Sequence, residues 1–443
     1  MNIKIKKILD KEIKRQQETI DLIPSENFTS PEVRELVGSV FMHKYSEGYP
    51  GERYYEGNEN IDELEKLCIE MVLKVFKAPK DWGANVQPLA GSNANLAVYN
   101  GLLEPRDKIL SMYLPDGGHL SHGWSYKKKG EVEESGMVYR GGSRKVNIVS
   151  KFFNVVQYKT DPKTNLFDYD FIEKLAIDEK PKLIITGGTA YPRNIDYKKM
   201  RKIADKVGAY YLADVAHEAG LIASGVISSP VGIADVITFT THKTLRGPKG
   251  AVIIAKDNLI KLINKSIIPG MQGGPHNGTI AAVTQALFEA DTNAFKKYSQ
   301  QIIKNAKILE EELKKHKFKL ITNGTDKHLL LINIKDKGVG GKYIARALAH
   351  TNIIANMNTI PYEVGSPLNP SGLRIGTPSV TTRGFKEKEM KQIAEWINEV
   401  TNIAINHSTD AFEFFENEII KNKDIQRIKK EVINLCLKFP FNV

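Results

Sequence analysis

The fold class is decided by an apolar run that leads into a polar turn, Val236-Ile-Thr-Phe-Thr-Thr-His-Lys-Thr-Leu-Arg-Gly-Pro-Lys-Gly250. The first six residues have the composition of a buried strand, and the Gly-Pro pair predicts a turn. Three similar apolar runs occur in the middle of the chain, at 182–188, 210–216 and 251–256. Alternation of such runs with helical stretches predicts an α/β domain around a mostly parallel sheet.

Helices and a second domain are predicted on both sides of this region. A helix over 4–20 is expected to present Ile5, Ile8, Leu9 and Ile13 on one face. A second helix after Asn60 is expected to bury Leu64, Leu67, Met71 and Val72. A lysine-rich helix from 294 to about 315, a strand at 329–335 and two more helices predict a smaller α+β domain.

The predicted organisation is an N-terminal helical segment (1–26), a large α/β domain (27–289) and a small C-terminal α+β domain (290–443). Residues 124–147 are polar and glycine-rich, which predicts a surface loop or hairpin.

Composition excludes several classes of protein. The chain has 443 residues and only two cysteines, Cys68 and Cys436, so neither a disulfide scaffold nor a cysteine metal site is expected. We expect no metal. No apolar run approaches the roughly 20 residues of a membrane helix, and the basic N-terminus lacks the apolar region of a secretory signal. These features predict a soluble, cytoplasmic protein with no membrane partner.

The formal net charge of +11 admits a nucleic-acid partner or an anionic small ligand. Much of the excess consists of lysines scattered on predicted helix faces, and no RNA- or DNA-binding motif is recognisable. We therefore expect no nucleic-acid partner.

Three segments carry residues that together suit one cofactor. Lys243 follows a predicted strand, where ligands bind in open α/β sheets, and its amine can form a Schiff base. Asp214 ends a second strand, and a buried carboxylate there needs a cation such as a protonated pyridine nitrogen. Gly91 and Ser92 precede a predicted helix whose N-terminus suits a phosphate. The combination predicts pyridoxal 5'-phosphate.

Seven separate motifs make the sequence similar to the serine (glycine) hydroxymethyltransferase family, over about residues 22–383. They are Ser25-Glu-Asn27, Lys44-Tyr-Ser-Glu-Gly-Tyr-Pro-Gly-Glu-Arg-Tyr-Tyr55, Gly117-Gly-His-Leu-Ser-His-Gly123, Asp214–His217, Thr241-His-Lys-Thr244, Pro269-Gly-Met-Gln-Gly-Gly-Pro275 and Gly372-Leu-Arg-Ile-Gly-Thr-Pro378. The resemblance implies a fold-type-I pyridoxal-phosphate enzyme, similar in fold to aspartate aminotransferase. The implied reaction converts serine and tetrahydrofolate, the co-substrate, to glycine and 5,10-methylene-tetrahydrofolate.

The resemblance also implies a role for each matching residue. Catalytic roles fall to Lys243, Glu47, His119, Asp214 and Thr241. The cofactor-binding residues would be Gly91, Ser92, His119, Thr189, Asp214, His217, His242, Lys243, Gly273, Gly274 and Tyr45. Serine would contact Ser25, Glu47, Tyr54, Tyr55 and Arg374, and the folate would contact Leu114, Gly118, Leu120 and Asn358.

Within these sets, Lys243 would hold the cofactor, His119 would stack on its ring, and Asp214 would pair with the ring nitrogen. Arg374 matches the substrate carboxylate because its planar fork binds carboxylates through two hydrogen bonds. Glu47 would move protons near the serine hydroxyl. The resemblance further implies a homodimer or a dimer of dimers, in which Tyr45, Glu47 and Tyr55 reach the neighbouring subunit's site.

Some positions depart from the family pattern. Ala90, Pro24, Met271 and Lys249 stand where a serine, a small residue, a glycine and an arginine are usual, and Thr189 replaces a common serine. The segment 124–147 looks longer than its counterpart in compact bacterial members, which suggests an altered folate entrance.

Two other functions stay open at this point. One is a folate-independent aldolase acting on β-hydroxy amino acids, or another pyridoxal-phosphate reaction on the same scaffold. The other is an RNA-binding regulator that uses the basic surface, whose binding should collapse as salt rises.

Overall fold

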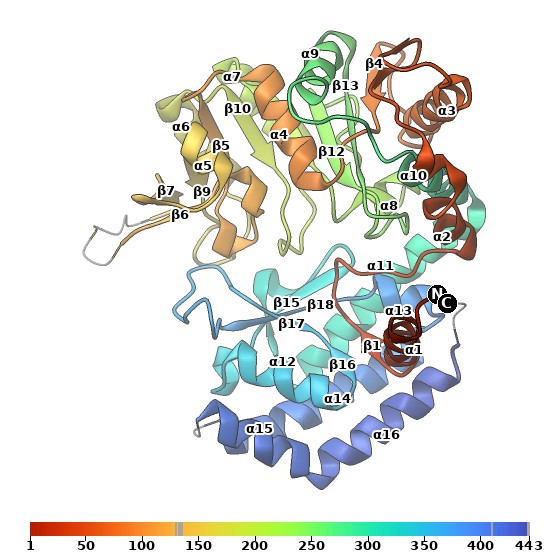
Figure 1. Ribbon diagram of the computed structural model, residues 1–443. Coiled ribbons are helices and arrows are strands. Elements are labelled where there is room, and N and C mark those ends of the chain that lie inside the picture. The colour runs from red at the N-terminus through yellow and green to blue at the C-terminus, as the bar shows by residue number, and fades with distance from the viewer. Residues whose placement is uncertain (129–130, 132–135, 409–410, 441–443) are drawn as a thin grey trace. The chain divides into compact units, whose positions relative to one another are not determined.

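The computed structural model describes residues 1–128, 131, 136–408 and 411–440 (Figure 1). It divides into two compact units. The large unit is Thr29–Ser299, and the small unit combines Met1–Phe28 with Gln300–Val443.

An eight-stranded sheet forms the centre of the large unit, and the five neighbours β12, β11, β10, β5 and β9 run parallel. Across the sheet the order is β4 (Trp82–Asn85), β13 (Ala251–Lys256), β12 (Val236–Thr240), β11 (Tyr210–Asp214), β10 (Leu183–Thr186), β5 (Lys108–Met112), β9 (Asn154–Tyr158) and β7 (Val138–Tyr139). The four apolar runs seen in the sequence are β10 to β13, and the prediction of a mostly parallel α/β sheet is confirmed.

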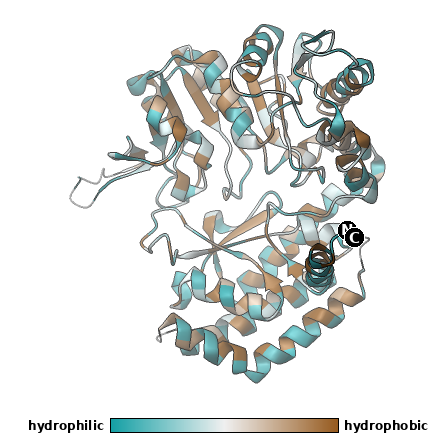
Figure 2. Cartoon of the chain, in the orientation of Figure 1, coloured by the Kyte–Doolittle hydropathy of each residue, from teal (hydrophilic) through white to brown (hydrophobic). Residues whose placement is uncertain are grey.

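Both faces of this sheet are buried. Alternate strand residues such as Ile184 and Leu110 join one apolar cluster, whereas their neighbours Leu183 and Ile109 join another. The first cluster includes side chains of α3 (Glu59–Val75), α6 (Tyr169–Glu179), α7 (Tyr197–Val207) and α10 (Asn277–Ala290). The second includes α4 (Gly91–Leu102) and α9 (Asp257–Ile267). Figure 2 shows most of these strands in hydrophobic colours, as two-sided burial requires.

Shorter elements complete the large unit. They are α2 (Pro31–Val37), η1 (Val40–His43), the β2–β3 hairpin (Gly48–Tyr49, Glu52–Arg53), η2 (Leu114–Asp116), η3 (Leu120–His122), α5 (Ile148–Phe152) and α8 (Ala219–Ala223).

The segment 124–147, predicted to be a surface loop or hairpin, contains short strands in its described residues. Its strands β6 (Ser125–Tyr126) and β8 (Arg144–Lys145) pair antiparallel, and β7 extends the central sheet by pairing with β9. Aromatic contacts explain this structure, because the rings of Trp124 and Tyr139 both pack against Tyr113. Residues 129–130 and 132–135 of the segment lie outside the described residues.

The small unit is built on a four-stranded antiparallel sheet. Its order is β14 (Lys319–Leu320), β15 (Leu329–Asn333), β18 (Gly372–Gly376) and β17 (Asn356–Asn358). Its helices are α1 (Ile3–Gln17), most of α11 (Asn293–Lys315), α12 (Gly341–His350), α13 (Pro378–Thr382), α14 (Glu387–His407), α15 (Phe412–Lys421) and α16 (Lys423–Leu437). The expectation of two helices after β15 is wrong, since five follow it in the described part of the chain.

Residues 1–28 are joined to the small unit by a parallel strand pair and by one buried arginine. β1 (Ile20–Asp21) pairs with β16 (Ile353–Ile354). The guanidinium of Arg383 donates to the carbonyls of Gln16, Gln17 and Thr19 at the end of α1, and also to carbonyls of Cys436 and Phe439.

Two expected apolar faces differ from the structure. The helix α1 forms, but none of its residues is buried, and Ile5 and Ile8 are 60% and 67% exposed. In α3, Leu67 is exposed, and the buried face instead contains Ile61 and Cys68. No helix in the described ranges is both long enough and apolar enough to cross a membrane.

Candidate functional site

A cavity of about 210 Å³ lies in the large unit, next to the carboxyl ends of β11 and β12. Ligands of open α/β sheets bind at this edge. Its lining is Ala90, Gly91, Ser92, His119, Gly188, Thr189, Asp214, Ala216, His217, Thr240, His242 and Lys243. Eight of the predicted cofactor residues are therefore brought together: Gly91, Ser92, His119, Thr189, Asp214, His217, His242 and Lys243.

Lys243 sits in a tight turn that directly follows β12. The hydroxyl of the fully buried Thr241 donates to the Pro248 carbonyl over 2.6 Å, and the Gly247 N–H donates to the Thr241 carbonyl over 2.7 Å. Thr244 donates its hydroxyl to the His217 carbonyl over 2.8 Å. These bonds hold the turn rigidly, and Lys243, only 9% exposed, lines the cavity. Thr241, by contrast, is not among the lining residues.

Asp214 is a buried carboxylate with several hydrogen-bond donors. Its Oδ2 lies 2.9 Å from Nε2 of His122 and accepts from Nδ2 of Asn95 over 2.8 Å. The Ala216 N–H donates to Oδ1 over 3.0 Å. Burial alone raises a carboxylate pKa, but the His122 bond and the neighbouring histidines hold the pKa of Asp214 well below its usual range. The carboxylate is therefore ionised at neutral pH.

A place for an anion lies at the N-terminus of α4. Ala90 is the N-cap residue and its side chain forms no capping bond, so the first N–H groups of the helix, at Gly91 and Ser92, are left for another acceptor. Nδ1 of His242 is buried and has no hydrogen-bond partner within the described residues. Burial and the nearby Lys243 lower the pKa of His242 to about 4.

The loops after β5 and β10 supply His119 and Thr189. The imidazole of His119 is half-buried, and its Nδ1 accepts the N–H of Ser121 over 3.2 Å. Thr189 lines the cavity and donates its hydroxyl to the Gly118 carbonyl over 3.0 Å. Gly187, with φ +118°, is required between these loops, since a Cβ would lie 1.9 Å from the Asp214 carbonyl oxygen.

His119, His122 and Asp214 form the one group of possible metal ligands found in the part of the chain that the structure describes, with ligand atoms within 4.8 Å of one another. The His122–Asp214 contact within this group is a hydrogen bond. The expectation of no metal stays a prediction.

A second cluster in the large unit contains the predicted residues of the tyrosine-rich motif. The hydroxyl of Tyr45 lies 3.4 Å from Oε1 of Glu47, and the rings of Tyr45 and Tyr55 meet edge to face at 5.3 Å. Gly273 lies directly against them, because a Cβ there would be 2.9 Å from Oε1 of Glu47. Gly274 is close to the ring of Tyr45. Tyr54 belongs to the same hairpin and is 71% exposed.

Sequence reasoning missed the group that anchors this cluster. Arg53 pairs with the buried carboxylate of Glu65 at 2.6 Å and with Asp62 at 2.8 Å. The same guanidinium donates to the carbonyls of Ser46 and Gly48, which flank Glu47. The sequence could have indicated this ion pair in one way. Glu65 lies at a helical spacing from the buried apolar residues of α3, where a carboxylate needs a cation such as Arg53.

The predicted substrate residues Ser25 and Arg374 lie in the small unit. Arg374 is on β18, its Nε donates to Asn356 over 3.1 Å, and burial lowers its pKa to about 10. The Gly376 N–H donates to the Leu22 carbonyl over 2.7 Å, which brings the segment leading to Ser25 beside the end of β18.

The predicted folate residues are divided between the units. Leu114 begins η2, the 52% exposed Leu120 begins η3, and Gly118 connects the two in the large unit. Asn358 ends β17 in the small unit and pairs with Gly372.

A family model, serine hydroxymethyltransferase, matches residues 1–397. Three relatives are 43–44% identical. The chain is 44% identical to the cytosolic serine hydroxymethyltransferase of Saccharomyces cerevisiae, over 98% of this chain and 94% of that protein. It is 43% identical to the cytosolic enzyme of Candida albicans, over 99% and 95%, and 43% identical to the mitochondrial enzyme of Kluyveromyces lactis, over 98% and 89%.

The chain belongs to the serine hydroxymethyltransferase family. Members are fold-type-I enzymes that use pyridoxal 5'-phosphate as cofactor and tetrahydrofolate as co-substrate. The family prediction, the fold class, the enzyme class and the cofactor are confirmed.

The cavity of this serine hydroxymethyltransferase family member fits the cofactor. The uncapped start of α4 and the unpartnered Nδ1 of His242 suit a phosphate, and the ionised Asp214 suits a protonated ring nitrogen. Ala90 lines the cavity without a hydroxyl, as its departure from the family pattern implies. Lys249 is exposed and contributes to the lowered pKa of His242.

Met271 lines a different hollow, whose walls are mostly apolar, of about 280 Å³. Pro24 lies against Gly376, where a Cβ would be 2.8 Å from the proline.

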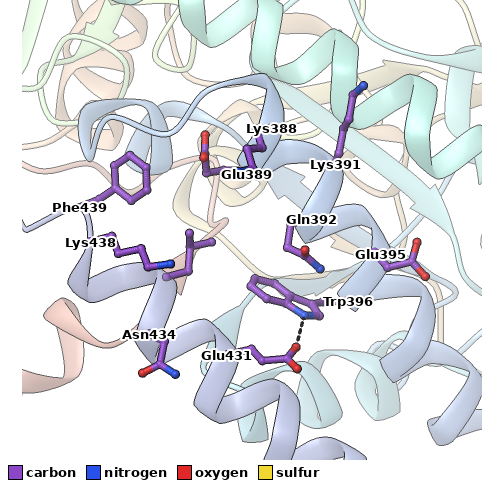
Figure 3. A pocket seen from close by; sticks show the side chains of 11 residues that line it. Lys388, Glu389, Lys391, Gln392, Glu395, Trp396, Glu431, Asn434, Lys438 and Phe439 are labelled. Atoms are coloured by element: carbon purple, nitrogen blue, oxygen red, sulfur yellow. Dashed lines mark hydrogen bonds between the residues drawn. The ribbon is translucent and has the colours of Figure 1, made fainter.

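A wider hollow of about 820 Å³ lies between α14 and α16 and contains none of the predicted site residues (Figure 3). Its side chains carry both charges, and the indole of Trp396 donates to Glu431 over 3.0 Å. Its lining is Lys388, Glu389, Lys391, Gln392, Glu395, Trp396, Glu431, Asn434, Leu435, Lys438 and Phe439.

Proposed function

We propose that this chain performs the family reaction in the cavity around Lys243, with the residue roles described below. The reaction transfers the hydroxymethyl group of serine to tetrahydrofolate and yields glycine and 5,10-methylene-tetrahydrofolate. The observation that supports the proposal most is the meeting of Lys243, Asp214, His119 and the open N-terminus of α4 in one cavity.

When bound, pyridoxal phosphate supplies an electron sink for bond cleavage at the substrate α-carbon. Lys243 provides the amine that attaches it, and Asp214 keeps a proton on its ring nitrogen by charge and hydrogen bonding. The N–H groups of Gly91 and Ser92, with His242, bind the phosphate. His119 covers the ring, and His217 and Thr189 contact its edge.

Glu47 is the group that moves protons at the serine hydroxyl, with Tyr54 and Tyr55 beside it. Arg374 binds the substrate carboxylate with help from Ser25, since a guanidinium fork matches a carboxylate. Leu114, Gly118, Leu120 and Asn358 bind the folate. Thr241 acts indirectly, by closing the turn that carries Lys243.

We further propose that the active form is a homodimer with shared sites. Large apolar and aromatic side chains that a folded monomer normally buries are exposed on the large unit. They are Val40, Met42, Tyr45, Tyr54, Tyr55, Leu120, Ile148, Phe152 and Met271. An exposed set of this kind is typical of an interface. In that dimer, Tyr45, Glu47, Gly273 and Gly274 serve the partner's cavity.

The cytosolic names of two relatives support a cytoplasmic location for this chain, although a mitochondrial relative is equally similar.

The visible spectrum of the purified protein tests the reaction and its cofactor together. It is recorded for the protein alone, with glycine, and with glycine plus tetrahydrofolate. We expect a yellow protein that develops a new long-wavelength band only when tetrahydrofolate is added. A glycine spectrum that ignores folate would favour the folate-independent aldolase, and a colourless protein that pyridoxal phosphate cannot reconstitute would overturn the Lys243 role.

The variant Glu47→Gln tests the proton-transfer role separately. We expect loss of folate-dependent serine cleavage with cofactor binding intact. Unchanged transferase activity would contradict the role of Glu47.

A further inference from the structure

Asn95 is a fully buried asparagine that none of the roles above uses. It lies on α4, one helical turn after Gly91, and is 1% exposed. Its side-chain amide makes three hydrogen bonds, one of them to a residue that lines the cofactor cavity. One amide hydrogen goes to Oδ2 of Asp214 over 2.8 Å, the other goes to Oγ of Ser121 over 2.8 Å, and the amide oxygen accepts from Thr238 over 2.6 Å.

The bonds of Ser121 extend this arrangement to His119. The Ser121 N–H donates to Nδ1 of His119, so that nitrogen carries no proton and must act as an acceptor. Oγ of Ser121 lies 2.6 Å from the same nitrogen. Because Nδ1 carries no proton, the hydrogen in this contact comes from the Ser121 hydroxyl, whose oxygen also accepts from Asn95. The proton of the neutral imidazole therefore resides on Nε2.

A single amide thus connects the group expected to pair with the ring nitrogen, Asp214, to the group expected to stack on the ring, His119. Asp214 and Asn95 are 119 positions apart in the chain, and no other described side chain forms hydrogen bonds to both Asp214 and Ser121. The Asp214 carboxylate fixes which way the amide faces, because an ionised carboxylate only accepts hydrogen bonds and so must face the amide NH2. The amide oxygen then faces Thr238 on β12, whose hydroxyl donates to it.

We propose that Asn95 is a positioning residue that fixes the Asp214 carboxylate and, through Ser121, the orientation and tautomer of His119. The proposal deepens the proposed function, on which it rests for the identity of the cofactor. Aspartate at this position would lose both donors and repel Asp214, and leucine would fill the space without any hydrogen bond. Only an amide with this orientation serves both neighbours.

The test compares Asn95→Leu with Asn100→Leu. Asn100 lies on the same helix and donates to Ser266 over 2.9 Å, away from the cavity, so it is a matched control. Two quantities are measured: the dissociation constant of pyridoxal phosphate for the cofactor-free protein, and the NMR titration of His119 in that protein. The second needs no cofactor.

For Asn95→Leu we expect the dissociation constant to rise about tenfold or more, because Asp214 loses a donor to its charged form. The titration midpoint of His119 should rise by about one pH unit, since Ser121 no longer holds its hydroxyl toward Nδ1. Asn100→Leu should change neither quantity.

Two further variants distinguish the effect of Asn95 on Asp214 from its effect on His119. Ser121→Ala should raise the His119 midpoint but leave cofactor affinity close to wild type. Thr238→Val, which removes only one hydroxyl, should change both quantities in the same direction as Asn95→Leu, and it carries the test if that variant does not fold. Wild-type values of both quantities in Thr238→Val and Asn95→Leu would overturn the proposal. A wild-type protein that binds no pyridoxal phosphate would overturn the proposed function, while the His119 titration would still decide the role of Asn95.

Discussion

His119 and His242 both line the cavity that contains Lys243, and their environments favour the neutral imidazole. Burial is the main cause for both. For His119 the neighbouring His122 adds to it, and for His242 the charges of Lys243 and Lys249 do so. The pKa of each falls to about 4 from the ordinary histidine value of 6.5. Neutral rings suit the proposed roles, because one stacks on a cofactor ring and the other donates a hydrogen bond.

These two pKa values predict a loss of stability in mild acid for the cofactor-free protein. Between pH 6.5 and 4 the unfolded chain binds protons at these histidines and the folded chain does not, so the free energy of unfolding falls as the pH falls. Urea unfolding at several pH values measures this slope. His119→Phe and His242→Phe should each reduce it. An unaltered slope in both phenylalanine variants would contradict the assignment.

How far the sequence reveals a residue depends on where its partners lie. Lys243 and Asp214 could be predicted because each follows an apolar strand, and strand ends of a parallel sheet meet at one edge. Asn95 could not, since its partners Asp214 and Ser121 are distant in the chain and no local spacing marks the contact. For Thr189, the sequence predicts a hydroxyl at the site. It does not predict that this hydroxyl donates to the Gly118 carbonyl.

Among the elements, the β2–β3 hairpin depends on a buried ion pair. Arg53→Met should lower the free energy of unfolding by about 3–5 kcal/mol, because Glu65 then remains buried without a cation. The double variant Arg53→Met with Glu65→Leu should recover part of this loss. Denaturant unfolding measures both. Arg15→Met, which breaks an exposed pair with Glu12, should cost only about 0–1 kcal/mol. Equal losses in the single and double variants would show that the charge pair is not the cause.

The hairpin β6–β8 packs against the segment that carries the predicted folate residues. Trp124 contacts the ring of Tyr113, next to Leu114, and the Asn147 side chain donates to the Leu120 carbonyl. Trp124→Ala should therefore raise KM for tetrahydrofolate roughly tenfold, because a displaced binding segment loses affinity. Affinity for pyridoxal phosphate should change little.

Steady-state kinetics with varied tetrahydrofolate check this expectation. Tyr126→Ala is the control, since Tyr126 lies on the same hairpin but packs against Arg144. A KM that responds equally to both substitutions would mean that the hairpin acts through its stability and not through the Tyr113 contact.

Helices and strands could be predicted well from the sequence where their apolar residues are buried by other parts of the same chain. The runs at β10 to β13 are buried on both faces, and burial on both faces leaves a continuous apolar stretch in the sequence. The helix α1 has a comparable pattern, yet Ile5 and Ile8 remain exposed, because a periodic pattern identifies the face but not what covers it. The segment 124–147 was harder, since its order comes from aromatic contacts with Tyr113 and not from periodicity.

At the scale of the whole molecule, the two groups of proposed site residues differ in exposure. The aromatic side chains around Glu47 are exposed, whereas the cofactor cavity contains buried residues. Lys243 is buried and lines the cofactor cavity, whereas Tyr54 and Tyr55 are 71% and 50% exposed and Glu47 does not line that cavity. If Glu47 has the proposed catalytic role, its site is complete only when another surface covers it. In a twofold dimer each cluster can cover the partner's cavity, because such interfaces are self-complementary.

Hybrid dimers test this arrangement directly. Lys243→Ala and Glu47→Gln homodimers should both lack transferase activity, because every site in them has lost one required group. A hybrid of the two chains, isolated with two different affinity tags, should regain about half of the wild-type kcat per dimer if Glu47 acts in the partner's site. One of its two sites then combines Lys243 of one chain with Glu47 of the other, and the second site carries both substitutions. A hybrid as inactive as its parents would mean that Glu47 serves the cavity of its own chain. Sedimentation of wild type and hybrid in the same buffer confirms that both are dimers when the rates are measured.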